Sequence, residues 1–183
     1  MEIRRAMYED LPRLMKLYEE GRQYMRSHGN LRQWTGGYPP ESLLKQDIES
    51  GCSYVCTEQG EIVGAFYFRL GEDPTYQRIE RGAWPDGEPY GVIHRIATCS
   101  HQKGVATFCV NWCASQCANL RMDTHEDNYV MQNFLKKNGF VYCGIIYTDD
   151  GTERLAYQKK CAAGSGMDMC RASGSGGSFN LFL

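Results

Sequence analysis

The sequence has little net charge, no long apolar run and no Cys-x-x-Cys pair. Lys and Arg number 20 and Asp and Glu number 22, which gives a net charge of −2 and a pI of about 6.1. This balance provides no long-range attraction to nucleic acid or to an anionic membrane. No run of about 18 apolar residues predicts a transmembrane helix, and the first residues lack the apolar core of a secretion signal. We therefore expect a cytoplasmic protein that binds neither nucleic acid nor a membrane.

Nine cysteines are present, but no two of them form a Cys-x-x-Cys pair. An odd number of cysteines in a chain of this size, without an export signal, favours reduced thiols over a disulfide framework. Cys109, Cys113 and Cys117 lie at i, i+4 and i+8 and would share one stripe of a helix. A metal site is one interpretation of this stripe. Apolar neighbours such as Val105 and Trp112 favour core packing instead, and we predict no metal.

Length and composition predict one domain followed by a tail. The chain has 183 residues, of which 42% are hydrophobic and 23% are charged, as in an ordinary soluble domain. We place this domain at residues 1–160. The tail, residues 161–183, is rich in Gly and Ser and ends in Phe-Asn-Leu-Phe-Leu. It is interpreted either as flexible or as a segment that docks on a neighbouring molecule through its last apolar residues.

Hydrophobic periodicity predicts strands and helices in a mixed order. Strands are expected at residues 2–6, 52–57 and 62–70, and helices at 10–26 and 40–50. Residues 58–61 predict a hairpin turn. Residues 71–89 are polar and acidic, and we expect them to form a solvated surface loop. Strands then alternate with helices from residue 90 to 158, which fits a mixed sheet with helices on both faces.

The most specific motif runs from Ile93 to Ala106, where an apolar strand passes through a short polar turn into an amphipathic helix. Lys103, Gly104 and Ala106 leave the N–H groups at the helix start with little bulk in front of them, so an anionic group can approach closely. This form is typical of a phosphate cradle and indicates a nucleotide-like ligand. The alternative is that Gly104 only shapes a strand-to-helix connection.

A strand-like run at 120–124, the polar segment ending in Asn128, a helix and the sequence Asn138-Gly139-Phe140 follow this turn. This order resembles the GCN5-related N-acetyltransferases over roughly Glu2 to Lys159. The resemblance implies an α/β fold with a mixed, mostly antiparallel sheet of six to seven strands and helices on both faces. It also implies that the sheet is splayed between its fourth and fifth strands, and that acetyl-CoA is the cosubstrate.

The resemblance also implies which residues would hold acetyl-CoA. The backbone N–H groups that would bind its phosphates belong to Gln102, Lys103, Gly104, Val105, Ala106 and Thr107. The pantetheine arm would be bound by the backbones of Ile96, Ala97 and Thr98 and by Asn128, for which a plain helix N-cap is the alternative. His101 replaces the first residue of the usual turn pattern, a departure that affects side-chain contacts to the phosphates and leaves the backbone contacts unchanged.

The acceptor amine must be neutral when it attacks, whereas an alkyl ammonium has a pKa of about 10.4. His94 is the first candidate for the general base, because an imidazole pKa of about 6.5 suits neutral pH and its strand should line the cleft. Arg95 would then face the other side of the sheet. The alternative is that His94 has a structural role and Arg95 faces the cleft. Asp123 and His125 form either an acid–imidazole pair on one face or a turn cap.

Many similar enzymes protonate the departing thiolate with a tyrosine four residues before the Gly-Phe pair. Leu135 occupies that position here. Either the thiolate leaves unaided, which its pKa of about 8.5 permits, or another donor such as Tyr129 or Tyr142 serves.

These features predict an N-acetyltransferase that moves an acetyl group from acetyl-CoA to a primary amine of a small molecule or peptide, by direct attack in a ternary complex. One alternative is a domain that binds acyl-CoA without turnover, as a sensor or partner module. Another keeps the fold but replaces CoA with a different phosphorylated ligand. A homodimer, common among similar proteins, has no marker in the sequence apart from the apolar terminus.

Overall fold

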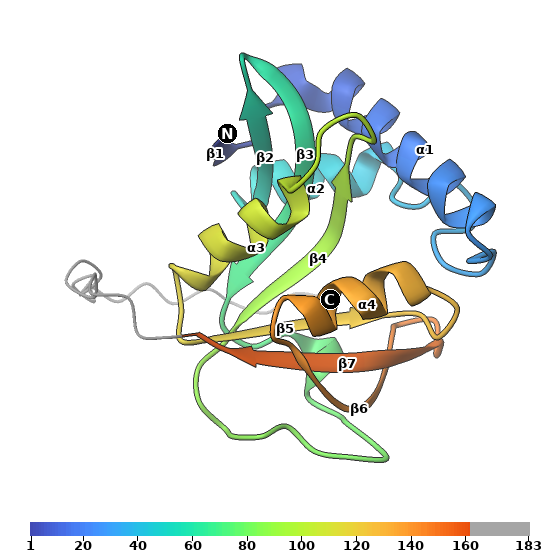
Figure 1. Cartoon of the computed structure of the whole chain (residues 1–183), viewed down its shortest axis with the longest axis vertical. Helices are drawn as coiled ribbons and strands as arrows, with labels where there is room; N and C mark the ends of the chain where they lie inside the picture. The colour runs from blue at the N-terminus through green and yellow to red at the C-terminus, as the bar shows by residue number, and fades with distance from the viewer. Residues whose placement is uncertain (162–183) are drawn as a thin grey trace, which may run out of the picture.

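The computed structural model describes residues 1–161, which form a seven-stranded sheet flanked by helices (Figure 1). The strands are β1 (Glu2–Arg5), β2 (Ser53–Glu58), β3 (Glu61–Leu70), β4 (Gly91–Thr98), β5 (Asn119–Thr124), β6 (Val141–Tyr147) and β7 (Glu153–Lys160). The helices are α1 (Leu11–Ser27), α2 (Glu41–Glu49), α3 (Val105–Ala114) and α4 (Tyr129–Lys137), with short 3₁₀ turns η1 (Tyr8–Asp10) and η2 (Pro74–Tyr76). Apart from Cys161, the predicted tail lies outside the described residues.

The sheet has the order β1-β2-β3-β4-β5-β7-β6, and every neighbouring pair is antiparallel except β4 and β5. The predicted mixed, mostly antiparallel sheet is therefore confirmed. Figure 1 shows α3 and α4 in front of the sheet and α2 behind it, so helices cover both faces.

The parallel strands β4 and β5 pair only at their beginnings. Gly91 lies opposite Leu120 and Val92 opposite Arg121, and no further pair joins these two strands. Beyond Val92 the strands diverge, as Figure 1 shows. The predicted splay between the fourth and fifth strands is confirmed, and it opens the centre of the sheet.

The β2–β3 hairpin confirms the turn predicted at residues 58–61. Gln59 and Gly60 both have positive φ, +51° and +83°. Two successive residues of this kind match the right-handed twist of the flanking strands in a two-residue hairpin.

A β-bulge in β4 changes which way its side chains face. Tyr67 on β3 lies opposite His94, and Ala65 lies opposite Ala97, so β4 has one residue more than β3 between these pairs. Arg95, at the bulge, has φ of +51°. Its guanidinium lies over the ring of Tyr67, 4.7 Å from the centroid, while the His94 ring is 5.7 Å from the same centroid. The expectation that Arg95 faces away from His94 is therefore wrong, because the extra residue breaks the strict alternation.

Residues 71–90, named here the 71–90 segment, lie largely at the surface, as expected from their composition, but buried residues anchor them to the sheet. Tyr76 is 1% exposed and packs with Val92 and with residues of β6 and β7 in a second, smaller core cluster. Glu80 exchanges two backbone hydrogen bonds of 2.8 Å with Ile145. The expectation of a solvated loop therefore holds for most of the segment, but its polar composition gave no sign of the anchoring by Tyr76 and Trp84.

Arg121 fastens the 71–90 segment to β5. Its guanidinium lies between two aromatic rings, 4.0 Å from the centroid of Trp84 and 3.7 Å from that of Tyr90. The Trp84 indole N–H donates to the carbonyl of Tyr76 over 2.9 Å. A buried cation between two ring faces is a strong desolvated contact.

Of the three cysteines predicted on one helix stripe, Cys109 and Cys113 lie on α3 in the main core, as predicted, whereas Cys117 lies beyond the end of the helix. Cys109 and Cys113 have no exposed surface, and Cys117 packs partly buried against the same cluster. Among residues 1–161 no group of three or more His, Cys, Asp or Glu side chains is arranged to hold a metal ion. None of the helices in this part of the chain combines the length and the hydrophobicity that crossing a membrane requires.

Candidate active site

A cleft of about 850 Å³ lies where β4 and β5 diverge. Its walls come from β4, the end of β5, the start of α4, the connection between α1 and α2, and the turn between β6 and β7. At one end it reaches Ala106 in the first turn of α3, and at the other it reaches Asp73 in the 71–90 segment. The predicted phosphate turn, at Ala106, and the predicted base, His94, therefore both border one cleft.

The start of α3 has the geometry of an anion-binding turn. Gly104 precedes the helix with φ of +82°, and a Cβ placed on it would meet no atom within 4 Å. The first backbone hydrogen bond of the helix runs from Phe108 N–H to the Gly104 carbonyl, 2.9 Å. The N–H groups of the first turn lack intrahelical acceptors, as at every helix start, and can serve an anion.

The residues predicted to hold CoA fall into two groups. Ile96, Ala97, Thr98, Ala106 and Asn128 line the cleft. The other five, Gln102, Lys103, Gly104, Val105 and Thr107, lie at or next to the turn, with only Val105 buried. This arrangement suits a long ligand that lies in the cleft along β4 and ends at the exposed turn.

Asn128 is the N-cap of α4, the plainer of its two interpretations. Its Oδ1 accepts from the Met131 N–H over 3.0 Å, and its Nδ2 donates to Gln33 Oε1 over 2.9 Å. Gln33 belongs to the connection between α1 and α2, so this amide joins two walls of the cleft.

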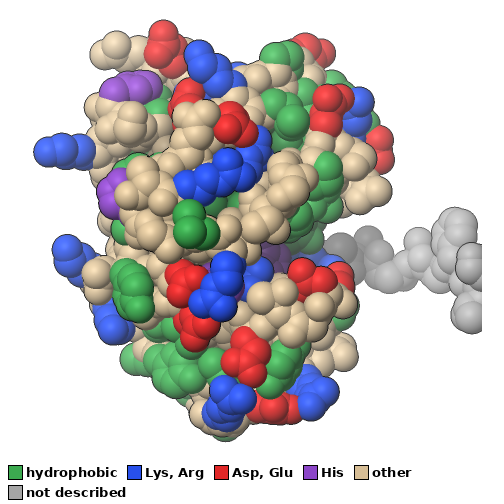
Figure 2. All heavy atoms as spheres, turned by 90° about the vertical axis from the view of Figure 1, so that its right-hand side faces the viewer, with side chains coloured by type: hydrophobic (Ala, Val, Ile, Leu, Met, Phe, Trp, Pro, Cys, Tyr) green, Lys and Arg blue, Asp and Glu red, His purple; other side chains and the backbone are tan. Residues whose placement is uncertain are grey.

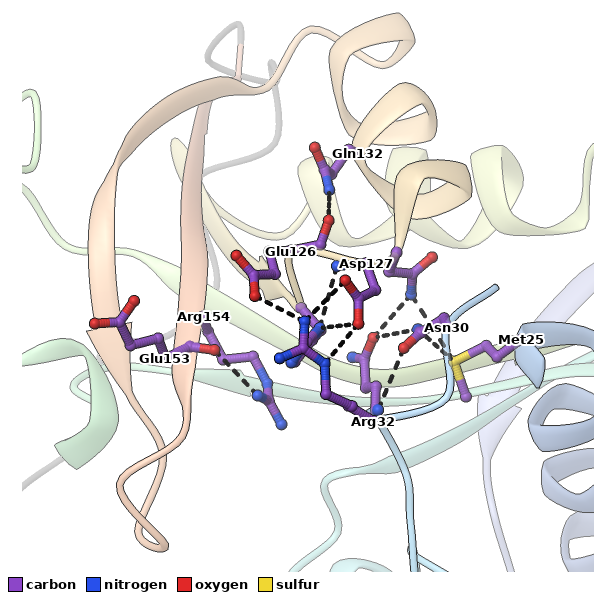
Figure 3. Close-up of polar contacts among 11 residues, drawn as sticks. Met25, Asn30, Arg32, Glu126, Asp127, Gln132, Glu153 and Arg154 are labelled. Atoms are coloured by element: carbon purple, nitrogen blue, oxygen red, sulfur yellow. Dashed lines mark hydrogen bonds and ion pairs between the residues drawn. The ribbon is translucent and has the colours of Figure 1, made fainter. Parts of the chain in front are cut away.

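The same two walls are joined at the surface by an ion pair. Arg32 donates to Asp127 Oδ2 and Glu126 Oε1 over 2.7 and 2.8 Å (Figure 3). Arg32 and Glu126 are largely exposed, and such surface pairs contribute at most about 1 kcal/mol. Acidic and basic side chains are interspersed over the face shown in Figure 2 rather than separated by sign.

His94 lies between two carboxylates at the end of the cleft nearest the 71–90 segment. Its Nε2 is 3.0 Å from Asp73 Oδ2, and its Nδ1 is 3.5 Å from Asp123 Oδ1. Val92 and Arg121 form the last backbone pair of β4 and β5, so the His94–Asp123 contact bridges these strands just beyond that pair. Asp123 Oδ1 also accepts from the Tyr76 hydroxyl over 2.8 Å.

The charges of this cluster stabilise one another. Burial opposes protonation of His94, but its hydrogen bonds to Asp123 and Asp73 outweigh burial and raise its pKa to about 9. Burial also opposes ionisation of Asp73 and Asp123, yet the contacts with His94 leave the pKa of each below its ordinary value. At neutral pH His94 is therefore an imidazolium held by two carboxylates.

The structure does not join Asp123 to His125. His125 Nδ1 instead accepts from the Asp127 N–H over 3.1 Å, which is the turn-capping alternative. Burial, followed by the positive charge of Arg154, lowers the pKa of His125. The acid–imidazole pair of the cleft is thus made by Asp123 with His94.

Arg95 is held on the other side of the cleft. Its Nη2 donates to both carboxylate oxygens of Asp47, over 2.9 and 2.8 Å, and its Nη1 donates to the Tyr38 hydroxyl over 3.3 Å. Burial raises the pKa of Asp47, although Arg95 opposes this shift. Both His94 and Arg95 line the cleft, so the two alternatives for these neighbours do not exclude each other.

No tyrosine occupies the helix position typical of the predicted thiolate donor. Leu135 is fully buried in the main core cluster. Tyr129, 67% exposed, lines the cleft, whereas Tyr142 packs on Tyr157 outside it. Of the two donors considered from the sequence, only Tyr129 is placed at the cleft.

Three residues at the His94 end of the cleft were not identified from the sequence. Asp73 and Tyr76 come from the 71–90 segment, and Arg154 comes from β7, with its Nε 3.9 Å from Asp123 Oδ2. Asp73 caps η2 by accepting from the Thr75 N–H over 3.0 Å, and the Asp-Pro-Thr pattern is a recognisable cap. That pattern places Asp73 at the start of a turn but gives no sign of its contact with His94.

Solved acetyltransferase structures share this fold. A GNAT-family acetyltransferase from Streptococcus agalactiae is 33% identical, covering 88% of this chain and 95% of that chain, with a TM-score of 0.80. One from Listeria monocytogenes is 20% identical, covering 87% and 94%, with a TM-score of 0.64. The NatB acetyltransferase complex bound to CoA and MES is 12% identical, covering 88% and 100%, with a TM-score of 0.55.

The Acetyltransferase (GNAT) family model matches residues 11–140, and the chain therefore belongs to this family. Membership supports an enzyme that acts as an acetyltransferase. The resemblance drawn from the phosphate turn and the Asn-Gly-Phe sequence is confirmed. No curated protein matched the sequence.

Proposed function

We propose that this protein transfers an acetyl group from acetyl-CoA to a primary amine by direct attack in a ternary complex. The observation that carries the proposal is the single cleft, which has an open helix start at one end and a carboxylate–imidazolium cluster at the other. An anionic donor and a cationic acceptor can therefore enter the same space and meet beside β4.

The donor end suits acetyl-CoA, the ligand that supplies the activated acetyl group. Open space at Gly104 and the N–H groups of the first turn of α3 fit a phosphate. Ile96, Ala97 and Thr98 lie on the part of β4 that does not pair with β5. Their backbone would hold the pantetheine arm and stabilise negative charge on a carbonyl oxygen. The CoA bound in the similar NatB complex supports this assignment.

At the acceptor end we assign Asp123 the contact with the amine. Its Oδ1 is engaged by Tyr76 and His94, whereas the closest cation to its Oδ2 is Arg154, at 3.9 Å. An ionised carboxylate in this position attracts an ammonium group and can accept a hydrogen bond from it.

His94 is assigned a positioning role. With a pKa of about 9, only about 1% of His94 is neutral at pH 7, so little of it can take a proton from the acceptor. As an imidazolium it fixes Asp73 and Asp123 on either side of it. The bound ammonium must lose a proton before it attacks, and we assign that proton to the neutral fraction of His94, which grows as the pH rises above neutrality.

The test is release of CoA thiol from acetyl-CoA with a panel of primary amines, including amino acids, polyamines and peptide N-termini. We expect amine-dependent release by the wild-type protein. Asp123→Asn should reduce kcat/KM by about 10- to 100-fold, the usual contribution of a charge-assisted hydrogen bond, while stabilisation by acetyl-CoA persists. Asp10→Asn is the matched control, since Asp10 is an ion-paired carboxylate of similar exposure, 9% against 13%, outside the cleft.

The outcomes separate the proposal from its alternatives. Stabilisation by acetyl-CoA without thiol release from any amine would support an acyl-CoA-binding domain, the interpretation that Leu135 at the tyrosine position favours. Stabilisation by another nucleotide that CoA does not displace would support a different phosphorylated ligand.

We include a cytoplasmic location in the proposal because the eight cysteines of residues 1–161 are free thiols.

A further inference from the structure

Four arginines in the described part of the chain have largely buried side chains. Three of them make at least two hydrogen bonds to other groups of the protein, although the buried Nε of Arg95 has no partner. Arg22 bonds Glu19 and two backbone carbonyls, and Arg95 bonds Asp47 and Tyr38. Arg121 bonds Gln158 and the carbonyl of Asp86, between two aromatic rings. A guanidinium has five N–H donors, and buried donors are normally satisfied in this way.

Arg154 is the exception. Its side chain is only 12% exposed, yet its single hydrogen bond runs from Nη1 to the carbonyl of its neighbour Glu153, 3.1 Å. Figure 3 shows the side chain extending from β7 toward the centre of the view. Its Nε is 3.9 Å from Asp123 Oδ2, too far for a hydrogen bond. Since Arg154 lines the cleft, its remaining donors are placed to meet an anion that enters there.

The neighbouring cations in the cleft are not free for such an anion. Arg95 is held by both oxygens of Asp47. His94 has one carboxylate at each ring nitrogen. Arg32 is paired with Glu126 and Asp127 at the surface. Arg154 thus has the fewest protein partners among the arginines that line this cleft.

Asp123 and Arg154 together present opposite charges side by side. Asp123 Oδ2 and Arg154 Nε are 3.9 Å apart, so a ligand that meets both must carry its two charges close together, as an α-amino acid does with its ammonium and carboxylate on one carbon. An ammonium at Asp123 and a carboxylate at Arg154 would make two parallel charge-assisted contacts. The amine would then lie at the carboxylate assigned to it above.

We propose that the acceptor is a free α-amino acid or a close analogue, with its amine at Asp123 and its carboxylate at Arg154. This proposal rests on the acetyl-transfer function proposed above and names the acceptor class. Arg154 is a specificity-determining residue in this scheme, because it binds a group that the transfer itself does not require.

The experiment compares acceptors that differ only in the carboxylate. Amine-dependent thiol release is measured with the standard α-amino acids, with the matching amino-acid amides and with the matching decarboxylated amines. For the amino acid that is used best, we expect kcat/KM to exceed that of its amide by about 10- to 100-fold, the usual contribution of a charged hydrogen-bonded pair.

Arg154→Gln should remove this preference by lowering kcat/KM for the acid while changing it little for the amide. Arg154→Lys, which keeps the charge but loses the fork of donors, should retain part of the preference. Arg78→Gln is the control, since Arg78 is an exposed arginine, 77% accessible, that does not line the cleft. Thermal unfolding of each variant separates loss of the fold from loss of specificity.

Equal use of acid and amide by the wild-type protein would overturn the acceptor assignment and leave acetyl transfer intact. An equal loss on both acceptors in Arg154→Gln would also overturn it, since Arg154 would then act on the acetyl group or on Asp123. Failure of every amine, including the amides and decarboxylated amines, would instead reject the function on which this proposal rests.

Discussion

The Asp73–His94–Asp123 cluster predicts that the protein loses stability as the pH rises above neutrality. Folding raises the pKa of His94 from its ordinary 6.5 to about 9. The folded protein therefore binds a proton that the unfolded chain releases, and this stabilises the fold. Because the pKa is raised, the contribution is complete below pH 6.5 and disappears as the pH rises through about 9.

The size of this effect follows from proton linkage. With pKa values of 6.5 unfolded and about 9 folded, protonation of His94 contributes about 2.5 kcal/mol at pH 7, about 1.4 kcal/mol at pH 8 and less than about 0.1 kcal/mol at pH 10. For a chain of this length the change between pH 7 and pH 10 corresponds to a fall of roughly 5–10 °C in melting temperature.

The assay is urea unfolding of the wild-type protein and of His94→Gln from pH 6 to pH 10. Subtracting the two free energies of unfolding cancels titration of groups outside the cluster. We expect the difference to shrink by about 2.5 kcal/mol between pH 7 and pH 10. A flat difference for His94→Gln would refute the cluster as described.

Gly104→Ala tests the donor end of the cleft and Gly82→Ala tests the anchoring of the 71–90 segment, each with a second glycine substitution as its control. Gly104→Ala and Gly151→Ala both place a side chain at φ near +80° in open space, and each should lower the free energy of unfolding by about 1 kcal/mol. Only Gly104→Ala should weaken the thermal stabilisation by acetyl-CoA, so Gly151→Ala is its control. Gly82→Ala would put a Cβ 2.0 Å from the Cys143 carbonyl oxygen and should lower the free energy of unfolding by about 2 kcal/mol or more, measured by chemical unfolding. Gly87→Ala is the control, since its added Cβ meets no atom within 4 Å, and it should change the free energy of unfolding little. Equal effects of Gly82→Ala and Gly87→Ala would contradict the packing described.

Local signals in the sequence were sufficient to predict the turn at Gly104 and the helix that follows it. A glycine at a strand-to-helix turn fixes the helix start, because few other residues adopt a positive φ at low cost. The apolar spacing of α3 placed Cys109 and Cys113 in the core, since period alone decides which face of a helix is buried. These features depend on residues close together in the chain, so the sequence allowed them to be predicted.

The acceptor end depends on contacts between distant residues. Asp73 is 21 positions from His94, and Tyr76 is 47 from Asp123. Nothing in the composition of the 71–90 segment indicates that it folds back onto β4 and β5. The prediction that side chains of β4 alternate between the two faces of the sheet also failed at Arg95. A β-bulge arises from the pairing of two strands, and the sequence of β4 alone does not mark it. Of the two interpretations of Asp123 and His125, the structure fits the turn cap, because the chain turns after β5 and His125 caps that turn.

The short pairing of β4 with β5 gives the middle of the sheet two unfinished edges. Backbone groups beyond Val92 and Arg121 face the cleft instead of a neighbouring strand, much as they would at the rim of a sheet. Such rims are where foreign strands add and where local opening begins. A ligand lying along β4 would cover one of these inner edges. The concentration of that ligand would then influence how often this part of the sheet opens locally. Hydrogen exchange at Ile96 to Thr98 would report that protection directly.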